Sequence, residues 1–215
     1  MPEFVDIPSP GWPLEFGEPG RPSVVLIHDE FGRLPYLEAY AKALAGQGFH
    51  VAVPDLFHGV ATVDPAGAAQ LEAELEPGFA LATLDDAVAL GRGHGAPRVG
   101  VIGLGPGARF GLRLGQSGSV DAVVAYYGLL DDSEAGIIPC PVLLHRAEDT
   151  AWAAGSDVDG FVSRLKEHGT PVTQHTYHGT SAGFANATVV PGLDKNAAAL
   201  AFARSTYFLQ AQLLD

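Results

Sequence analysis

A glycine-rich segment near the middle of the chain, 103–107 (Gly-Leu-Gly-Pro-Gly), has the spacing of a nucleophile elbow. In the motif G-x-S-x-G the central residue lies on a sharp turn between a strand and a helix, and it carries the attacking atom. An apolar run at 98–102 precedes the segment, and a run of helical period at 108–114 follows it. The context therefore fits the motif, but the central residue is Gly105, which has no attacking atom. The sequence predicts an elbow without the usual covalent chemistry.

The rest of the chain alternates short β-branched runs with longer segments of helical period, a pattern typical of a parallel sheet covered by helices. The first twenty or so residues are rich in Pro and Gly and are expected to form a short irregular hairpin. We find no repeat and no domain boundary, so we expect one α/β domain over 1–215, with a mostly parallel twisted sheet and helices on both faces. The expected strands are 23–28, 50–53, 98–102, 121–126, 141–145 and 171–177, and the expected helices are 36–44, one opening at 64–65, 79–90, 108–114, 158–165 and 197–213.

In open sheets of this kind the working site lies at the carboxyl ends of the strands. At these positions each residue also has an ordinary structural explanation: Asp29 can cap a turn, Glu30 can be solvated, and Arg109 can pair with a surface carboxylate. Of the two tyrosines after one strand, we expect one to be in the core and the other to face the cleft. The strand-end candidates are His28, Asp29, Glu30, Phe57, His58, Gly105, Tyr126, Tyr127, Arg146, Glu148, Asp149 and the turn 177–184.

Several short segments, taken together, resemble the dienelactone hydrolase family of the α/β-hydrolase fold. The matching pieces are 24–32, 53–57, the glycine-framed elbow, 125–128, 146–149 and 177–184. The resemblance implies the α/β-hydrolase fold. It also implies hydrolysis of lactones and esters by a Cys or Ser nucleophile, an Asp and a His.

Carried over position by position, the resemblance places the nucleophile at Gly105, the acid at Asp149 and the base at Ala182. The residue after the nucleophile, whose N–H normally holds the oxyanion, is Pro106, which has no N–H. In a model triad hydrolase, loss of nucleophile and base removes about 10⁶ in kcat. Loss of one oxyanion donor removes roughly another 10²–10³. Of the triad only the acid remains, and of the oxyanion donors only the N–H of Glu30.

Two further positions depart from the family pattern. The family's glutamate after the first long strand corresponds to Asp29, and its substrate-carboxylate arginine corresponds to Asn186. Recognition of an anionic dienelactone is therefore not expected.

We expect a repurposed non-hydrolytic enzyme, a cyclase, isomerase or lyase, that positions a small apolar molecule such as a polyketide and transfers protons. Proximity and orientation alone can supply ~7–11 kcal/mol. The alternative is a catalytically silent protein that binds a ligand or partner, and a third reading is an ester or lactone hydrolase using substitute residues. The catalytic candidates are His28, Asp29, Glu30, His58, Tyr127 and Asp149, and the substrate-binding candidates are Phe57, Gly105, Pro106, Tyr126, His178, Ala182, Phe184 and Asn186.

Composition limits the partners. The chain of 215 residues has 12 Lys and Arg against 25 Asp and Glu, a net charge of -13, which disfavours nucleic acid and anionic membranes. The single cysteine, Cys140, and an N-terminus without a leader pattern indicate a reducing cytoplasm. No histidine or cysteine pair has metal-ligand spacing, and the glycines at 100–107 do not match a dinucleotide fingerprint, so we expect no metal and no cofactor. A small molecule is the expected partner, and the sequence leaves the oligomeric state open, a homodimer included.

Overall fold

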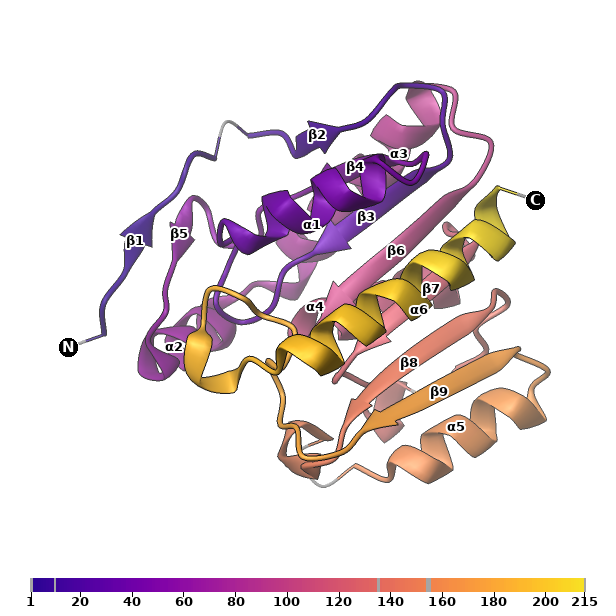
Figure 1. The fold of residues 1–215 in the computed structure, drawn as a ribbon. Coiled ribbons are helices and arrows are strands. Elements are labelled where there is room, and N and C mark those ends of the chain that lie inside the picture. The colour runs from indigo at the N-terminus through magenta and orange to yellow at the C-terminus, as the bar shows by residue number, and fades with distance from the viewer. Residues whose placement is uncertain (1, 10, 135, 154–155, 215) are drawn as a thin grey trace.

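The structure is a computed structural model that describes residues 2–9, 11–134, 136–153 and 156–214. A seven-stranded sheet of order β2-β4-β3-β6-β7-β8-β9 forms its centre (Figure 1). Strand β2 runs antiparallel to β4, and the other neighbours are parallel. The strands are β2 (Leu14–Phe16), β3 (Ser23–Ile27), β4 (His50–Val53), β6 (Val99–Leu104), β7 (Ala122–Tyr126), β8 (Val142–Ala147) and β9 (Val172–Tyr177).

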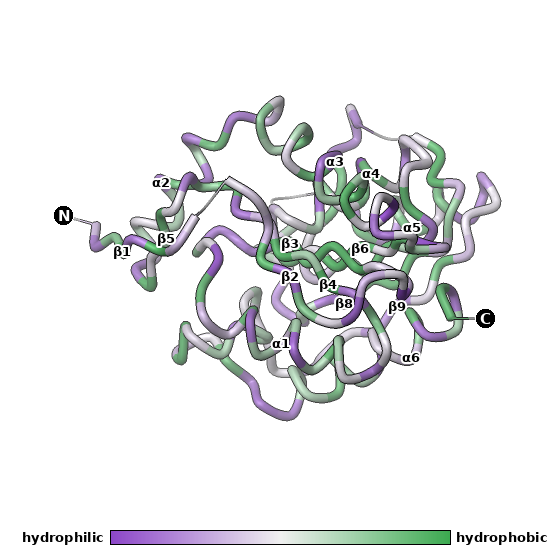
Figure 2. Tube along the Cα trace, turned by 90° about the horizontal axis from the view of Figure 1, so that it is seen from above, coloured by the Kyte–Doolittle hydropathy of each residue, from purple (hydrophilic) through white to green (hydrophobic). Residues whose placement is uncertain are grey.

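Helices cover both faces of this sheet (Figure 2). Val24 and Leu26 of β3 pack into the core beneath α1 and α6, while Val25 and Ile27 pack into the core beneath α3, α4 and α5. Side chains alternate between the faces of a strand, so a strand covered on both sides is apolar throughout. The expected fold class is confirmed. The helices are α1 (Tyr36–Ala45), α2 (Pro65–Glu74), α3 (Pro77–Gly93), α4 (Pro106–Ser117), α5 (Val158–Glu167) and α6 (Lys195–Leu213), with short 3₁₀ turns η1 (Asp132–Glu134), η2 (Thr150–Ala153) and η3 (Val190–Gly192).

The prediction of a hairpin at the N-terminus is wrong. Strand β1 (Val5–Asp6) pairs with β5 (Val60–Ala61), and β2 pairs with β4, so the two N-terminal strands do not pair with each other. Pro8 and Pro13 lie between them, and proline cannot donate to a strand ladder. Each strand instead joins a free edge formed by a distant segment.

The parallel strands all end at the same edge of the sheet, where the loops that follow them meet. Gly105 follows β6, Tyr127 follows β7 and Asp149 lies just beyond β8. The register aligns Ile27 with Gly103 and Leu104 with Tyr126. The fold therefore brings the ends of these strands to one edge of the sheet. Among the described residues, no helix is both long and apolar enough to cross a membrane.

Candidate active site

Gly105 forms the turn between β6 and α4. Its backbone has φ +53° and ψ −121°, a conformation that L side chains rarely adopt. The Gly105 N–H donates to the carbonyl of Tyr126 over 3.0 Å. A Cβ at Gly103, Gly107 or Gly128 would overlap neighbouring backbone atoms. The glycines therefore permit the close strand-turn-helix packing of a nucleophile elbow, and the turn has the predicted shape.

The helix after the elbow begins at Pro106, so the first residue past the turn offers no N–H. Proline suits this position, because the first N–H groups of a helix have no partner within it. The Ala108 N–H donates back to the Gly105 carbonyl over 3.0 Å. One of the donors expected at an oxyanion site is therefore missing.

A cavity of about 350 Å³ opens at Gly105. Its polar side chains include the carboxylates of Glu30, Glu72 and Asp131. Arg109, which also lines the cavity, is bound to Asp131 over 2.5 Å and to Glu134 over 2.8 Å, as expected from the sequence. The cavity is thus predominantly acidic. Its lining consists of Glu30, Glu72, Gly105, Pro106, Arg109, Tyr127, Gly128, Leu129, Asp131, Ala151, Trp152, Ala153, Ser156 and Ala182.

Glu30 occupies the space above the elbow. Its Oε2 lies 2.7 Å from the position that a Cβ on Gly105 would take. Burial, and then the nearby charge of Asp29, raise the pKa of Glu30 from 4.5 to about 7. A carboxyl group that can both take and release a proton near neutral pH therefore lies where the side chain of the central elbow residue would project.

Asp29, beneath Glu30, is fully buried and hydrogen-bonded. It accepts from Asn186 Nδ2 over 2.8 Å, from the Tyr36 hydroxyl over 3.2 Å and from the Phe31 N–H over 3.1 Å. Burial raises the pKa of Asp29 to about 6, although these hydrogen bonds oppose the shift. The Asn186 Oδ1 accepts two backbone N–H groups of its own turn, at 3.0 and 3.1 Å, which fixes the orientation of the amide. These hydrogen bonds fix Asp29, the chain neighbour of Glu30.

Two hydrogen-bond donors in the cavity wall lack acceptors. The Tyr127 hydroxyl and Trp152 Nε1 are buried and have no hydrogen-bond partner among the residues that the structure describes. Tyr127 has φ +36°, uncommon for a residue other than glycine, and its ring packs edge-on against Phe184 at 5.4 Å between centroids. Burial and the charges of Asp29 and Glu30 raise the pKa of Tyr127 well above its ordinary value, so it is a protonated donor. Buried donors normally have partners, so these two are unsatisfied polar groups of residues that line the cavity.

Comparison with known proteins shows the family to which this chain belongs. The family model of the dienelactone hydrolase family matches residues 15–213. The chain belongs to the dienelactone hydrolase family. No curated protein sequence matches it.

Solved structures share the fold of this dienelactone hydrolase family member at low sequence identity. A dienelactone hydrolase-like promiscuous phosphotriesterase from metagenomic libraries is 18% identical, with TM-score 0.75 over 99% of this chain and 98% of its own. A dienelactone hydrolase from Anabaena variabilis is 17% identical, with TM-score 0.68 over 99% and 98%. An esterase from Pyrobaculum calidifontis is 15% identical, with TM-score 0.64 over 98% and 85%. At these identities the likeness establishes the fold.

The three positions on which the resemblance would place a triad, Gly105, Asp149 and Ala182, lie in different surroundings. Gly105 and Ala182 line the cavity. Asp149 is exposed, and its Oδ1 accepts from the Ala151 N–H of its own loop over 3.0 Å. His178, close to Ala182 in the sequence, is also exposed and pairs with Glu148 over 2.7 Å. Asp149 and His178 are therefore satisfied outside the cavity lining.

His28 and Phe57 lie behind the cavity. The His28 Nδ1 donates to the Asp29 carbonyl over 2.7 Å, and Nε2 accepts from the Leu56 N–H over 3.0 Å. Burial lowers the pKa of His28, so the ring is neutral and both nitrogens are used. Phe57 packs against this ring at 4.7 Å between centroids. These two predicted site residues support the loop that carries Asp29 and Glu30.

His58 and Tyr126 are also displaced from the predicted site. His58 stacks on Phe79 at 4.2 Å and lines a separate cavity of about 400 Å³. Tyr126 is completely buried, and its hydroxyl bonds Ser205 over 2.8 Å and Tyr40 over 3.0 Å. Of the two adjacent tyrosines, Tyr126 is thus the core residue and Tyr127 the cavity residue.

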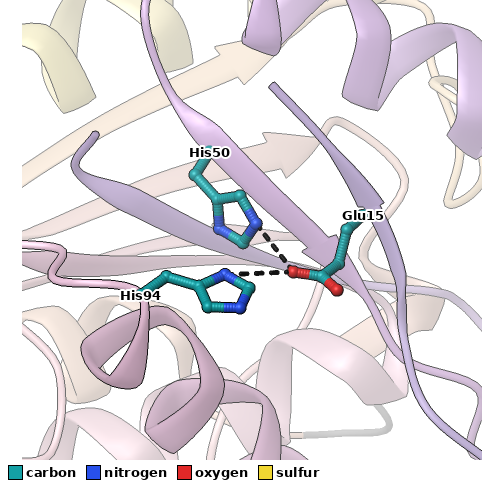
Figure 3. Close-up of side chains that lie close together, drawn as sticks. All are labelled: Glu15, His50 and His94. Carbon is teal, nitrogen blue, oxygen red and sulfur yellow. Dashed lines mark hydrogen bonds and ion pairs between the residues drawn. The ribbon is translucent and has the colours of Figure 1, made fainter. Parts of the chain in front are cut away.

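Sequence reasoning missed three contributors to this site: Glu72, Trp152 and Tyr36. Glu72 and Tyr36 lie on helices, where nothing in the pattern marks them. Trp152 lies in the loop after β8, so the strand-end rule could have found it. Glu15, His50 and His94, three residues able to hold a metal ion, lie close together (Figure 3). They lie at the amino end of the sheet, since His50 is the first residue of β4 and His94 directly follows α3.

Proposed function

We propose that this family member is a non-hydrolytic enzyme that transfers a proton on a small uncharged molecule, in an isomerase, lyase or cyclase reaction. The observation that carries the proposal is the Glu30 carboxyl group above Gly105, with a pKa of about 7. General acid–base catalysis is most effective when the pKa lies near the working pH. Glu30 meets this condition, and proton transfer by Glu30 requires no nucleophile at Gly105.

In the proposed step, Glu30 removes a proton from a carbon next to a substrate carbonyl group. The C–H electron pair forms the carbon–carbon double bond of an enolate, and negative charge develops on the oxygen. The Tyr127 O–H and the Trp152 N–H donate hydrogen bonds to that oxygen. Within the part of the chain that the structure describes, neither donor has a hydrogen-bond partner. Where a C=C bond adjoins the enolate, Glu30 then returns the proton to the far carbon of that bond. The double bond shifts into conjugation with the carbonyl group, which completes an isomerisation and restores the carboxylate.

The cavity also suggests the substrate class. Its volume of about 350 Å³ is within the usual range for small-molecule sites. The carboxylates of Glu30, Glu72 and Asp131 disfavour an anionic substrate. Leu129 and Trp152 supply apolar surface. An uncharged, carbonyl-bearing compound such as a polyketide fits these features best.

Three absences support a non-hydrolytic role. Gly105 and Ala182 have no nucleophilic or basic atom, and Pro106 has no N–H for an oxyanion. In model triad enzymes these losses together remove about 10⁸ or more in rate. Asp149 is directed to its own loop and does not compensate for them.

The second candidate function is binding alone, by a protein that holds a ligand and catalyses no reaction. The two unpartnered donors of Tyr127 and Trp152 would hold a carbonyl oxygen equally well without any reaction. This alternative differs from the first in one respect: it requires no proton transfer by Glu30.

Hydrogen exchange separates these functions. The protein is incubated in D₂O with lactones, enones and 1,3-diketones, and NMR and mass spectrometry record deuterium uptake, isomers and cyclised products. We expect catalysed exchange that is lost in Glu30→Gln and kept in Glu167→Gln, the same change at an exposed site on α5. Saturable binding without exchange would favour the silent protein. Stoichiometric labelling at one residue by a serine- or cysteine-reactive ester probe would instead support hydrolysis by substitute residues.

A further inference from the structure

A second cluster of potential ligands lies at the amino end of the sheet, away from the Gly105 cavity. Glu15 of β2, His50 at the start of β4 and His94 just after α3 direct one donor atom each to a common point (Figure 3). These atoms lie within 4.8 Å of one another. The Glu15 Oε2 is 2.9 Å from His50 Nε2 and 3.3 Å from His94 Nδ1.

We propose that Glu15, His50 and His94 bind one divalent transition-metal ion of the Zn²⁺ class. A four-coordinate ion with bonds of about 2.0–2.1 Å places its ligand atoms about 3.3 Å apart. The two distances to Glu15 are close to this value, so a bound ion requires only small side-chain adjustments.

The hydrogen bonding of the two imidazole rings is consistent with a metal ion bound between these three side chains. The His94 Nδ1 is buried, yet it has no hydrogen-bond partner among the described residues, because its contact with Glu15 lacks the necessary geometry. The His50 Nδ1 lies 3.2 Å from the Ser23 hydroxyl, so its Nε2, which contacts only Glu15 among the described residues, is the nitrogen that would bind an ion in place of that contact. An outer partner on the second nitrogen is the usual arrangement for a metal-binding histidine.

The donor set indicates the kind of ion. Two imidazole nitrogens and one carboxylate suit Zn²⁺ and its neighbours, whereas Ca²⁺ and Mg²⁺ prefer sets of oxygen ligands. His50 is buried, but the side chains of Glu15 and His94 are 35% and 32% exposed. Water can therefore complete the coordination.

Such an ion would join three separate parts of the fold. Glu15 lies on the edge strand β2, His50 on β4 and His94 at the end of α3. Because the site is at the other end of the sheet from Gly105, its expected effect is to fasten β2 to the body of the protein. This inference is independent of the proposed proton-transfer function.

Calorimetric titration of the chelator-treated full chain with ZnCl₂ tests the site. We expect one ion per chain and a rise in Tm with Zn²⁺. In His94→Ala the affinity should fall by more than the roughly tenfold to hundredfold that loss of an outer-shell partner costs. The matched control is His178→Ala, which removes the exposed histidine of the His178–Glu148 pair and should leave the affinity unchanged.

A second readout identifies the ligands directly. Co²⁺ bound in place of Zn²⁺ should give the intense visible absorption of four-coordinate cobalt in the native chain and lose it in Glu15→Gln. Absence of one-to-one Zn²⁺ binding would overturn the proposal. So would unchanged affinity in His94→Ala, or loss of affinity in His178→Ala.

Discussion

Replacing Glu30 by glutamine should make the protein more stable above neutral pH and also inactive. Burial raises the pKa of Glu30 from 4.5 to about 7. The folded protein therefore holds a proton that the unfolded chain releases, and the free energy of unfolding falls as the pH rises from 4.5 to about 7. Above that window the ionised carboxylate destabilises the folded state.

The difference between a pKa of about 7 and the ordinary 4.5 corresponds to about 3.5 kcal/mol at about 1.4 kcal/mol per pKa unit. Because the side chain lines a solvent-accessible cavity, we expect about 2 kcal/mol to be measured. Glutamine cannot ionise, so Glu30→Gln should recover this amount at about pH 8 and show little difference from the native chain at about pH 4.

Urea unfolding followed by circular dichroism at a series of pH values measures this difference. Taking the difference between the two proteins cancels the titration of the other carboxylates. The control Glu167→Gln changes an exposed carboxylate and should give a curve parallel to that of the native chain. A Glu30→Gln variant that is no more stable than the native chain at about pH 8 would contradict the raised pKa, and with it the main support for Glu30 as the base.

Three further substitutions test the surroundings of Glu30. Gly105→Ala should lower the free energy of unfolding by ~1–3 kcal/mol, because of the positive φ and the 2.7 Å approach of its Cβ to Glu30 Oε2; urea unfolding measures the loss. Asn186→Ala removes the 2.8 Å hydrogen bond to Asp29, so it should cost ~1–3 kcal/mol and raise the pKa of Asp29 above about 6, which NMR titration can follow. Tyr127→Phe removes a hydroxyl without a partner, so it should leave Tm nearly unchanged while reducing catalysed hydrogen exchange.

Each of these predictions has an outcome that would contradict it. Gly118→Ala is the reference for Gly105→Ala, because its φ is also positive but its added Cβ would meet nothing within 4 Å, so it should cost less. An unchanged pKa of Asp29 in Asn186→Ala would mean that the amide does not stabilise the carboxylate. Tyr126→Phe breaks one buried and one partly buried hydrogen bond. A stability loss in Tyr127→Phe as large as in Tyr126→Phe would show that the Tyr127 hydroxyl is satisfied in the native protein.

Most of the fold could be predicted because its signals are local. Runs such as Val24 to Ile27 are apolar at every position, and a strand covered on both faces requires this. Pro77 and Pro106 begin helices that were expected to begin slightly later. The N-terminal hairpin could not be predicted, since its strands pair with β4 and β5, and pairing depends on which distant edges are free.

The candidate site was predictable only to the level of the sheet edge. The strand-end rule selected both Asp29 and Glu30, but the position above Gly105 is taken by Glu30, whereas Asp29 lies buried against Asn186 and Tyr36. Adjacent residues after a strand turn to different sides, and loop packing decides which side faces the cavity.

By itself, the sequence determined which atoms are present: there is no side-chain atom beyond the backbone at Gly105, no imidazole at Ala182 and no N–H at Pro106. These are covalent properties and do not depend on folding. Only the tertiary structure decided that the Glu30 carboxyl group lies above the elbow, that Tyr127 and Trp152 border the same cavity, and that Glu15, His50 and His94 meet at the other end of the sheet. The distances between such residues, and the burial that shifts their pKa values, arise from the packing of segments far apart in the chain.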